Sequence, residues 1–575
     1  MQTSGVAKND HSPEPARASG ASLGELIFQR LAKDPDETVS VLVRSDGTEL
    51  PVSASLLARR AAGFARHLGY VKGRRKVVAI TLYQGLDLHA AWIGTVWAGH
   101  IPTMVAPPSM RMEPTKFASG FRGIMERIQA DLQIIDHATA KKLGDELANL
   151  PAAIVAEEVK DTEPINEPAH IAPNDIILIQ HSSGSTGLQK AVALTSQQVL
   201  AHNSAYCRVL DISPRDTIVS WLPLYHDMGF VACFLLPLLH GIKLVEMSPF
   251  DWVLHPHTLF QAISRHRGTL CWLPNFAFSF LAQSVKLDPR EPPPDISSIR
   301  AWINCSEPVI SSSMRKFVER FAPLGANWQQ MSSSYAMAEN VFAATQSQPG
   351  RITELTVDRN AFMSLHMAVP VADSSENGMV FVSSGQPLPT TEMQIRGGDN
   401  DRVKDGQVGE IWLHGTHQFS GYFGSAELTS ASIDTEGWYK TGDLGFFHDS
   451  ELFVTGRSKD LIIIQGRNFY PGDIEKSIGE IEGISGGRVV AFGLPDEATG
   501  TEQLVVLAEA EISNKADPRM LALKMRNCIA QEFNCTPADT RIVPPRWLVK
   551  STSGKPARSE NRAKYIAQFR EGHDV

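Results

Sequence analysis

Cysteine is scarce in this chain, and its spacing argues against two common uses of the residue. Six cysteines are scattered over 575 residues, and none forms a C-x-x-C pair. Structural zinc sites usually need such pairs, and disulfide frameworks need a denser pattern. The spacing therefore favours a protein of the reducing cytoplasm.

A surplus of basic residues and a long apolar run are also missing. The net charge is −9, which gives no electrostatic support for non-specific binding to nucleic acid. The most apolar stretch, at 230–239, is too short to span a bilayer and contains Pro237. We expect a buried helix there and no integral membrane segment.

Short apolar runs are present, and they alternate with helical segments. The runs at 77–82 and 176–179 are typical of buried strands, and the segment 88–97 is typical of a helix. Such alternation predicts a layered α/β body with mostly parallel strands. A chain of 575 residues is too long for one core, so further parts are expected.

Changes in the residue pattern along the chain predict where these parts begin and end. Antiparallel strands are expected after Gly409, and a charged break at 456–460 precedes a compact α+β segment with a helix at 518–533. The predicted parts are a disordered leader that is not a signal peptide (1–22), a large N-terminal α/β domain (23–457) with a β-rich subdomain (384–456), and a small, mobile C-terminal α+β domain (458–575).

Two lysines that lie far apart in the sequence have surroundings that suit phosphate. Lys190 follows the Ser-Ser-Gly-Ser-Thr-Gly run at 182–187, and Lys555 follows Gly554 near the end of the chain. Glycines let backbone N–H groups approach an anion, hydroxyls donate hydrogen bonds, and lysine supplies charge. The first segment lacks the spacing of a Walker P-loop and could be an ordinary turn. If both lysines act on one nucleotide, the tail must close over the body.

Three other segments could contact a nucleotide, and each has a purely structural alternative. Tyr335 and Glu339 would face the same way at a helix start, where the ring could stack on a base and the carboxylate could hold Mg²⁺. Asp443 could accept hydrogen bonds from both ribose hydroxyls, with Arg457 in reach. His226 could face a cleft. Each has a structural alternative. Glu339 could be an acid at the start of a helix, Asp443 could be a turn residue with Arg457 as a solvated surface charge, and His226 could be a buried core histidine.

Taken in order, these segments resemble the adenylate-forming superfamily of acyl-CoA synthetases, luciferases and non-ribosomal peptide adenylation domains. The resemblance covers about residues 25–565. The segments 221–229 and 460–475 are similar to the forms seen in fatty acyl-AMP ligases. The extra segment at 346–380 resembles the insertion of that family, which is thought to restrain the C-terminal domain and to disfavour CoA.

The resemblance implies a role for each matching residue around the nucleotide. The phosphates would be wrapped by Ser182, Ser183, Gly184, Ser185, Thr186 and Gly187, beside Lys190. Adenine would lie against Ser333, Ser334, Tyr335 and Ala336, with the tyrosine ring stacked on the base. The metal candidates are Glu339 and Thr186, and the ribose would be held by Asp443 and Arg457.

The remaining implied roles concern the acid and the tail. Lys459 would be the hinge, and His226 would sit at the junction of the acyl group and the nucleotide. Lys555 would bridge the fatty carboxylate and the α-phosphate, so the catalytic candidates are Lys555, His226 and Lys190. The acyl-pocket candidates are Trp221, Asn275, Phe276 and Phe278, for which plain core packing is an equal alternative.

Three positions depart from the family pattern without removing a charged catalytic group. Ala191 and Ala336 replace glycines that usually follow the loop lysine and the stacking tyrosine. Ser333 stands where amino-acid-activating relatives carry an asparagine that contacts adenine.

The implied activity is ATP- and Mg²⁺-dependent conversion of a fatty acid to acyl-AMP, followed by transfer to the phosphopantetheine thiol of an acyl carrier protein. An acyl-CoA synthetase is the main alternative, and the insertion argues against it. A catalytically silent nucleotide-binding protein is the second, and the intact charged residues argue against that.

Overall fold

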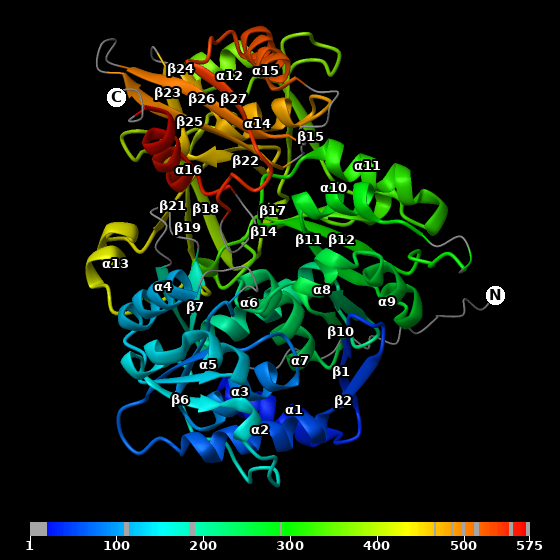
Figure 1. Cartoon of the computed structure of the whole chain (residues 1–575), viewed down its shortest axis with the longest axis vertical. Helices are drawn as coiled ribbons and strands as arrows, with labels where there is room; N and C mark the ends of the chain where they lie inside the picture. Colours follow the sequence, from blue (N-terminus) through cyan, green and yellow to red (C-terminus); the bar gives the residue numbers. More distant parts are fainter. Residues whose placement is uncertain are drawn as a thin grey trace, which may run out of the picture.

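The computed structural model describes residues 20–108, 114–182, 190–287, 290, 292–464, 467–484, 487–496, 501–510, 517–550 and 556–570. The predicted leader lies outside the described residues up to position 19. Within the described part, no helix combines the length and hydropathy of a membrane-spanning segment. The N-terminal elements form the large lower body in Figure 1, and the C-terminal elements lie above it.

Two seven-stranded sheets make up the body. The first has the order β13-β12-β11-β9-β10-β1-β2 and is parallel except for the β1–β2 pair. Its strands are β1 (Thr38–Val43), β2 (Glu49–Ser53), β9 (Thr217–Ser220), β10 (Lys243–Met247), β11 (Leu270–Pro274), β12 (Ala301–Cys305) and β13 (Met331–Ser333). This confirms the predicted layered body of mostly parallel strands.

The second sheet has the order β20-β8-β7-β4-β3-β5-β6. Its strands are β3 (Val77–Thr81), β4 (Ile101–Met104), β5 (Leu132–Ile135), β6 (Ala152–Val155), β7 (Ile176–Ser182), β8 (Lys190–Thr195) and β20 (Gly421–Tyr422). The pairs β7–β8 and β8–β20 are antiparallel, and the others are parallel. The strands predicted at 77–82 and 176–179 are β3 and β7.

Helix α3 (Leu86–Trp97) joins the two sheets. It packs on β3 and β4 of the second sheet, and its His89 lies 2.9 Å from Glu246 on β10 of the first. A Cβ on Gly94 would come within 2.5 Å of the Ala61 carbonyl oxygen on α2 (Ala54–Leu68), so glycine permits this close helix contact. The apolar stretch at 230–239 is buried, as predicted, but it begins as the π-helix η3 (Met228–Leu235) before α7 (Leu236–His240).

Ten further α-helices occur in the described residues before the C-terminal elements, and one of them, α12, belongs to the insertion. They are α1 (Leu23–Lys33), α4 (Pro114–Arg127), α5 (His137–Leu143), α6 (Ser196–Val209), α8 (Pro249–Leu254), α9 (Thr258–His266), α10 (Asn275–Ser284), α11 (Ser311–Phe321), α12 (Arg359–Leu365) and α13 (Ala426–Ser432). Helices α1 and α6 begin with capping boxes, in which Ser22 and Thr195 exchange hydrogen bonds with a residue three positions on.

An antiparallel four-stranded sheet connects the body to the C-terminal elements. Its strands are β18 (Thr391–Arg396), β19 (Gly409–Gly415), β21 (Tyr439–His448) and β22 (Glu451–Arg457). It confirms the antiparallel strands predicted after Gly409. Strands β14 (Thr345–Gln346) and β17 (Gln386–Pro387) form a separate two-stranded sheet beside it.

The C-terminal elements follow the predicted α+β pattern. They are β23 (Ile462–Ile464), β24 (Arg467–Phe469), α14 (Pro471–Gly479), β25 (Val489–Asp496), β26 (Thr501–Glu509), α15 (Pro518–Phe533), β27 (Asp539–Val543) and α16 (Arg558–Tyr565). The helix predicted at 518–533 has those bounds, because Asp517 caps its first turn and Asn534 ends it in the left-handed conformation.

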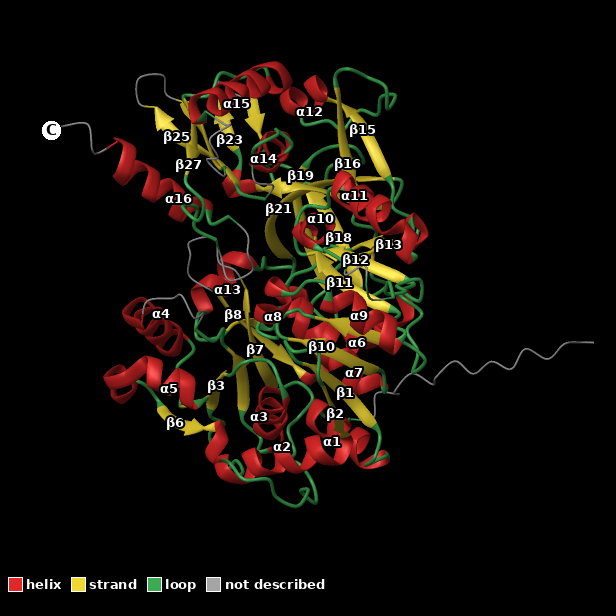
Figure 2. Ribbon diagram, turned by 45° about the vertical axis from the view of Figure 1, so that its right-hand side comes forward, coloured by secondary structure: helices red, strands yellow, loops and turns green. Residues whose placement is uncertain are grey.

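The insertion packs on the C-terminal elements. It forms β15 (Glu354–Asp358), α12 and β16 (Gly378–Val382), and Figure 2 shows α12 beside α15. The Phe362 ring lies 5.3 Å from the Tyr470 ring, and the Arg359 guanidinium lies 5.2 Å from the centre of Phe533. Insertion and C-terminal residues thus share one hydrophobic cluster.

A buried carboxyl group close to this contact gives stability a pH dependence. Burial raises the pKa of Asp473 to about 6, and its Oδ2 has no hydrogen-bond partner among the described residues. The folded protein keeps this proton up to about pH 6, whereas the unfolded chain releases it near pH 4. The free energy of unfolding therefore falls as pH rises between these values and stays lower above them.

Asp473→Asn is expected to raise the free energy of unfolding by about 2 kcal/mol more at pH 7 than at pH 4.5, because the amide carries no charge to bury at either pH. Urea unfolding of the wild type and the variant at both pH values measures this difference. Asp399→Asn, at an exposed position, is the control. An equal effect of Asp473→Asn at the two pH values contradicts the interpretation.

Candidate functional site

Three side chains meet at the antiparallel sheet. Asp443 on β21 pairs in register with Arg457 on β22, and the Arg457 Nε donates to Asp443 Oδ1 at 3.0 Å. The Tyr335 hydroxyl donates to Asp443 Oδ2 at 2.7 Å. Burial raises the pKa of Tyr335 well above its ordinary value, so its hydroxyl stays a donor. The structure thus brings together the predicted adenine and ribose residues.

The helix start predicted for Tyr335 and Glu339 is wrong. Tyr335 lies in extended backbone after β13, and Glu339 lies in the short 3₁₀ turn η6 (Ala338–Asn340). The serines compete with helix formation: Ser334 Oγ donates to the Thr345 carbonyl, and Ser333 Oγ donates to the Ser383 carbonyl. An isolated bridge between Ala336 and Ala343 also keeps the backbone extended.

Glu339 is the centre of a second cluster. Its Oε1 accepts hydrogen bonds from Ser182 Oγ at 3.0 Å and from the Tyr422 hydroxyl at 2.9 Å. The Lys190 Nζ donates to the Tyr422 hydroxyl at 3.2 Å and lies 4.6 Å from the centre of its ring. Strands β7, β8 and β20 and the η6 turn therefore bring a lysine, a carboxylate and two hydroxyls together.

Ser182 and Lys190 are register partners across β7 and β8, at the two ends of the predicted phosphate loop. The predicted phosphate residues Ser183, Gly184, Ser185, Thr186 and Gly187 lie outside the described residues. Tyr422 was not predicted from the sequence. It is 83 and 232 positions from Glu339 and Lys190, so no local spacing links it to them. Its hydroxyl also lies 3.4 Å from the Tyr439 hydroxyl.

The donor set at Glu339 fits Mg²⁺. In the part of the chain that the structure describes, no group of three or more His, Cys, Asp or Glu side chains is placed to hold a metal ion without other ligands. Magnesium usually binds one or two carboxylates together with substrate phosphates and water, so a lone buried carboxylate beside a predicted phosphate loop is a suitable ligand.

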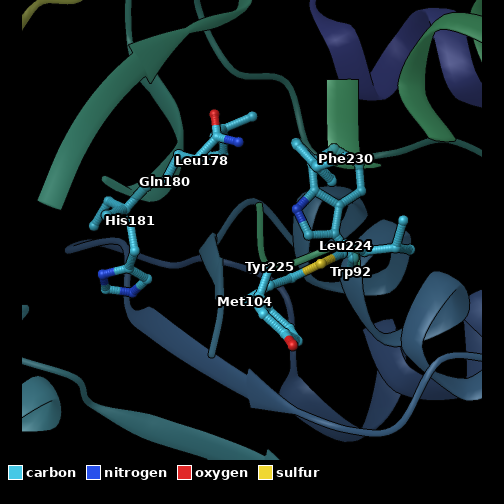
Figure 3. Close-up of a pocket in the computed structure, with 9 residues that line it drawn as sticks. Trp92, Met104, Leu178, Gln180, His181, Leu224, Tyr225 and Phe230 are labelled. Atoms are coloured by element: carbon cyan, nitrogen blue, oxygen red, sulfur yellow. The ribbon is translucent and has the colours of Figure 1, made fainter. Parts of the chain in front are cut away.

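A small pocket lies next to His226. Figure 3 shows Leu178, Gln180 and His181 on one side of it and Trp92, Leu224 and Phe230 on the other, with Met104 and Tyr225 between them. The His226 ring lies 4.8 Å from the Tyr225 ring. His226 itself does not line the pocket, but its neighbour in the chain does.

The four predicted acyl-pocket residues lie elsewhere, in packed surroundings. The Trp221 ring stacks on Trp252 at 3.7 Å with Phe276 at its edge, and Phe278 is fully buried against Phe317. Asn275 Oδ1 accepts from the Asn304 amide and from the Ile310 N–H. These contacts agree with core packing as well as with the wall of a pocket, so the acyl role of the four stays a prediction.

The tail reaches the body beside the site. Lys459 lies in the 3₁₀ turn η7 (Ser458–Asp460), and burial lowers its pKa to about 8. Lys555 lies outside the described residues, but an isolated bridge joins Lys550 to Pro556 on either side of its segment. Burial lowers the pKa of Lys550 to about 8, and the carboxylate of Glu307, on the body, opposes this shift.

Comparison with known proteins identifies the family. The family model described as AMP-binding enzyme matches residues 30–423. The chain belongs to this family. FadD32 of Mycolicibacterium smegmatis, named a long-chain-fatty-acid–AMP ligase, is 30% identical to this AMP-binding enzyme, and the alignment covers 91% of this chain and 90% of FadD32.

Solved structures give the same placement within the AMP-binding enzymes. A structure from studies of fatty acyl-adenylate ligases from E. coli and L. pneumophila matches with a TM-score of 0.87 and 26% identity, covering 96% of this chain and 98% of the other. The L. pneumophila ligase in complex with acyl adenylate and pyrophosphate matches with a TM-score of 0.72 and 26% identity, covering 95% and 96%. The chain therefore falls among the fatty acyl-AMP ligases, as the sequence resemblance predicted.

Proposed function

We propose that the protein uses ATP to convert a fatty acid to acyl-AMP with release of pyrophosphate, and then passes the acyl group to the phosphopantetheine thiol of an acyl carrier protein. The observation that carries this proposal is the convergence of two clusters from distant segments. Tyr335, Asp443 and Arg457 form the first, and Lys190 and Glu339 belong to the second.

In the first step, a carboxylate oxygen of the fatty acid attacks the α-phosphorus of ATP, and the bond to pyrophosphate breaks. Asp443 would hold the ribose, and Lys190 would oppose the charge of the β- and γ-phosphates. Glu339 and Thr186 would hold Mg²⁺, which supplies charge neutralisation at the phosphates when it is bound. Such a reaction depends mainly on positioning and electrostatic stabilisation.

In the second step, rotation of the C-terminal part about Lys459 would exchange Lys555 for another face of that part. A hinge motion of this kind needs only a few residues that absorb the change in backbone angles. The contact of Phe362 with Tyr470 ties the insertion to the part that must rotate. It agrees with the restraint that the sequence resemblance implies for this insertion, and that resemblance is what favours a carrier protein over CoA.

Asp443→Ala is expected to raise the apparent KM for ATP about 100-fold. The variant lacks the carboxylate that would accept two charge-assisted hydrogen bonds from the ribose, and about 1.5 kcal/mol for each bond, the lower end of the usual range, corresponds to this factor. Pyrophosphate release measured against ATP concentration tests this. Asp449→Ala, in the exposed turn between β21 and β22, is the control. A KM within threefold of wild type would remove Asp443 from the ribose site.

Mass spectrometry of the products tests the proposed function directly. The enzyme is incubated with Mg·ATP and fatty acids of different lengths, with CoA, with a holo acyl carrier protein, or with neither. Acyl-AMP accumulation without acyl-CoA, together with acylation of the carrier, is the expected result. Efficient acyl-CoA formation would contradict the choice of acceptor, and the absence of any adenylate would contradict the first step.

A further inference from the structure

Tyr422 occupies a position that the proposed roles do not use. Its side chain is buried, with 4% of its surface exposed, and its ring packs edge-on against Phe419 at 4.9 Å. A phenol keeps its proton at neutral pH, so the hydroxyl can donate one hydrogen bond while its oxygen accepts others.

The direction of these hydrogen bonds is informative. Lys190 Nζ donates to the Tyr422 oxygen, and the Tyr422 hydroxyl donates to Glu339 Oε1. A hydroxyl that accepts from an ammonium group becomes a stronger donor, because hydrogen bonds in a chain polarise one another. Tyr422 thus connects the positive charge of Lys190 to the carboxylate.

Both hydrogen bonds to the Glu339 carboxylate reach the same oxygen. Ser182 Oγ and the Tyr422 hydroxyl donate to Oε1, while no described residue donates to Oε2. Two donors on one oxygen stop the carboxylate from rotating and leave the other oxygen for a ligand. Partners that orient a metal-binding carboxylate in this way commonly change metal affinity 10- to 100-fold when they are removed.

We propose that Tyr422 is a positioning residue that holds Glu339 with its second carboxylate oxygen directed at the Mg²⁺ of the bound nucleotide. This inference rests on the proposed function, in which Glu339 binds the metal. The simplest competing explanation is that Tyr422 only fills the core with its ring.

Tyr422→Phe separates these explanations, because phenylalanine keeps the ring, its packing on Phe419 and its contact with the Lys190 ammonium. Only the hydroxyl is lost, together with its hydrogen bonds to Lys190 and Glu339 and its 3.4 Å contact with the Tyr439 hydroxyl. Tyr206→Phe is the matched control: Tyr206 is also buried, and its hydroxyl contacts Gln346 and Trp272 and not Glu339 or Lys190.

The measurement is calorimetric binding of α,β-methylene-ATP, which cannot form an adenylate, over a range of Mg²⁺ concentrations and in EDTA. For Tyr422→Phe we expect the apparent Mg²⁺ affinity to fall about tenfold, while binding in EDTA stays within twofold of wild type. Tyr206→Phe should change neither quantity. Thermal melting of both variants reports any general loss of stability.

Two results would overturn the inference. If the Mg²⁺ dependence of nucleotide binding is unchanged in Tyr422→Phe, Tyr422 is only a core residue. If nucleotide affinity falls equally with and without Mg²⁺, Tyr422 acts on the nucleotide pocket and not on the metal ligand. Failure of the proposed function looks different: wild-type protein would then release no pyrophosphate from ATP with any fatty acid, whatever the behaviour of Tyr422.

Discussion

Lys555→Ala is expected to slow acyl-AMP formation by about 10²–10³-fold. The attacking carboxylate and the α-phosphate are both negative, and a single cation placed between them opposes the repulsion as they approach. Removing one preorganised group of this kind typically costs about 3–4 kcal/mol in the transition state. Single-turnover formation of acyl-AMP from saturating ATP and fatty acid measures the effect without interference from product release.

The surroundings of Lys555 make this test specific. The described residues on either side are fixed: Lys550 bridges to Pro556, and the Asn561 side chain bonds to the backbone of Val549 and Ala557. Alanine at 555 should therefore leave the C-terminal fold intact. Lys524→Ala, on the exposed face of α15, removes the same charge elsewhere and should keep the wild-type rate. A variant at 555 with most of the wild-type rate would mean that the tail lysine is misassigned.

Phe362→Ala is expected to let the enzyme use CoA. Phe362 is fully buried, and its ring contacts the rings of Phe381, Phe446 and Tyr470. Replacing a buried phenylalanine by alanine costs about 3–5 kcal/mol. If most of that loss falls on the contact with Tyr470, the C-terminal part is released from the insertion, and the equilibrium between its orientations shifts by up to about 10²–10³-fold.

The readout is the ratio of acyl-CoA to acyl-AMP formed in the presence of CoA. Leu365→Ala on the same helix is the control, because Leu365 is 69% exposed and supports no contact of this kind. Increased acyl-CoA in Phe362→Ala alone is the expected result. Equal product ratios in both variants, with adenylate formation retained, would show that the insertion contact does not set the acceptor.

The pairing of Asp443 with Arg457 could be predicted from the sequence more readily than the cluster around Glu339, for a physical reason. Asp443 and Arg457 face each other across one hairpin, so sequence neighbours already limit where they can lie. Tyr422 reaches Lys190 and Glu339 only because β20 adds to the edge of a sheet built from much earlier strands. Strands that pair across such a long sequence separation leave no periodicity or residue spacing that could be recognised in the sequence.

The wrong helix start at Tyr335 has a different origin. Spacing alone placed Tyr335 and Glu339 on one helix face, but buried serine hydroxyls hold the segment extended through contacts with residues 11 and 50 positions further on. Propensity within a short window carries no information about those partners. The α+β pattern of the C-terminal part was easier to predict, because its helix at α15 is capped by its own neighbours.

The ion pairs of Arg558 decide where this chain can be joined to a relative. Its guanidinium forks onto Glu475, with Nε at 3.1 Å from Oε1 and one terminal nitrogen at 2.6 Å from Oε2, and its other terminal nitrogen lies 2.9 Å from Asp460 Oδ2. These ion pairs therefore join the η7 turn, α14 and the start of α16. A chimera that exchanges the C-terminal part should place its junction before Asp460, so that all three charges come from the same parent.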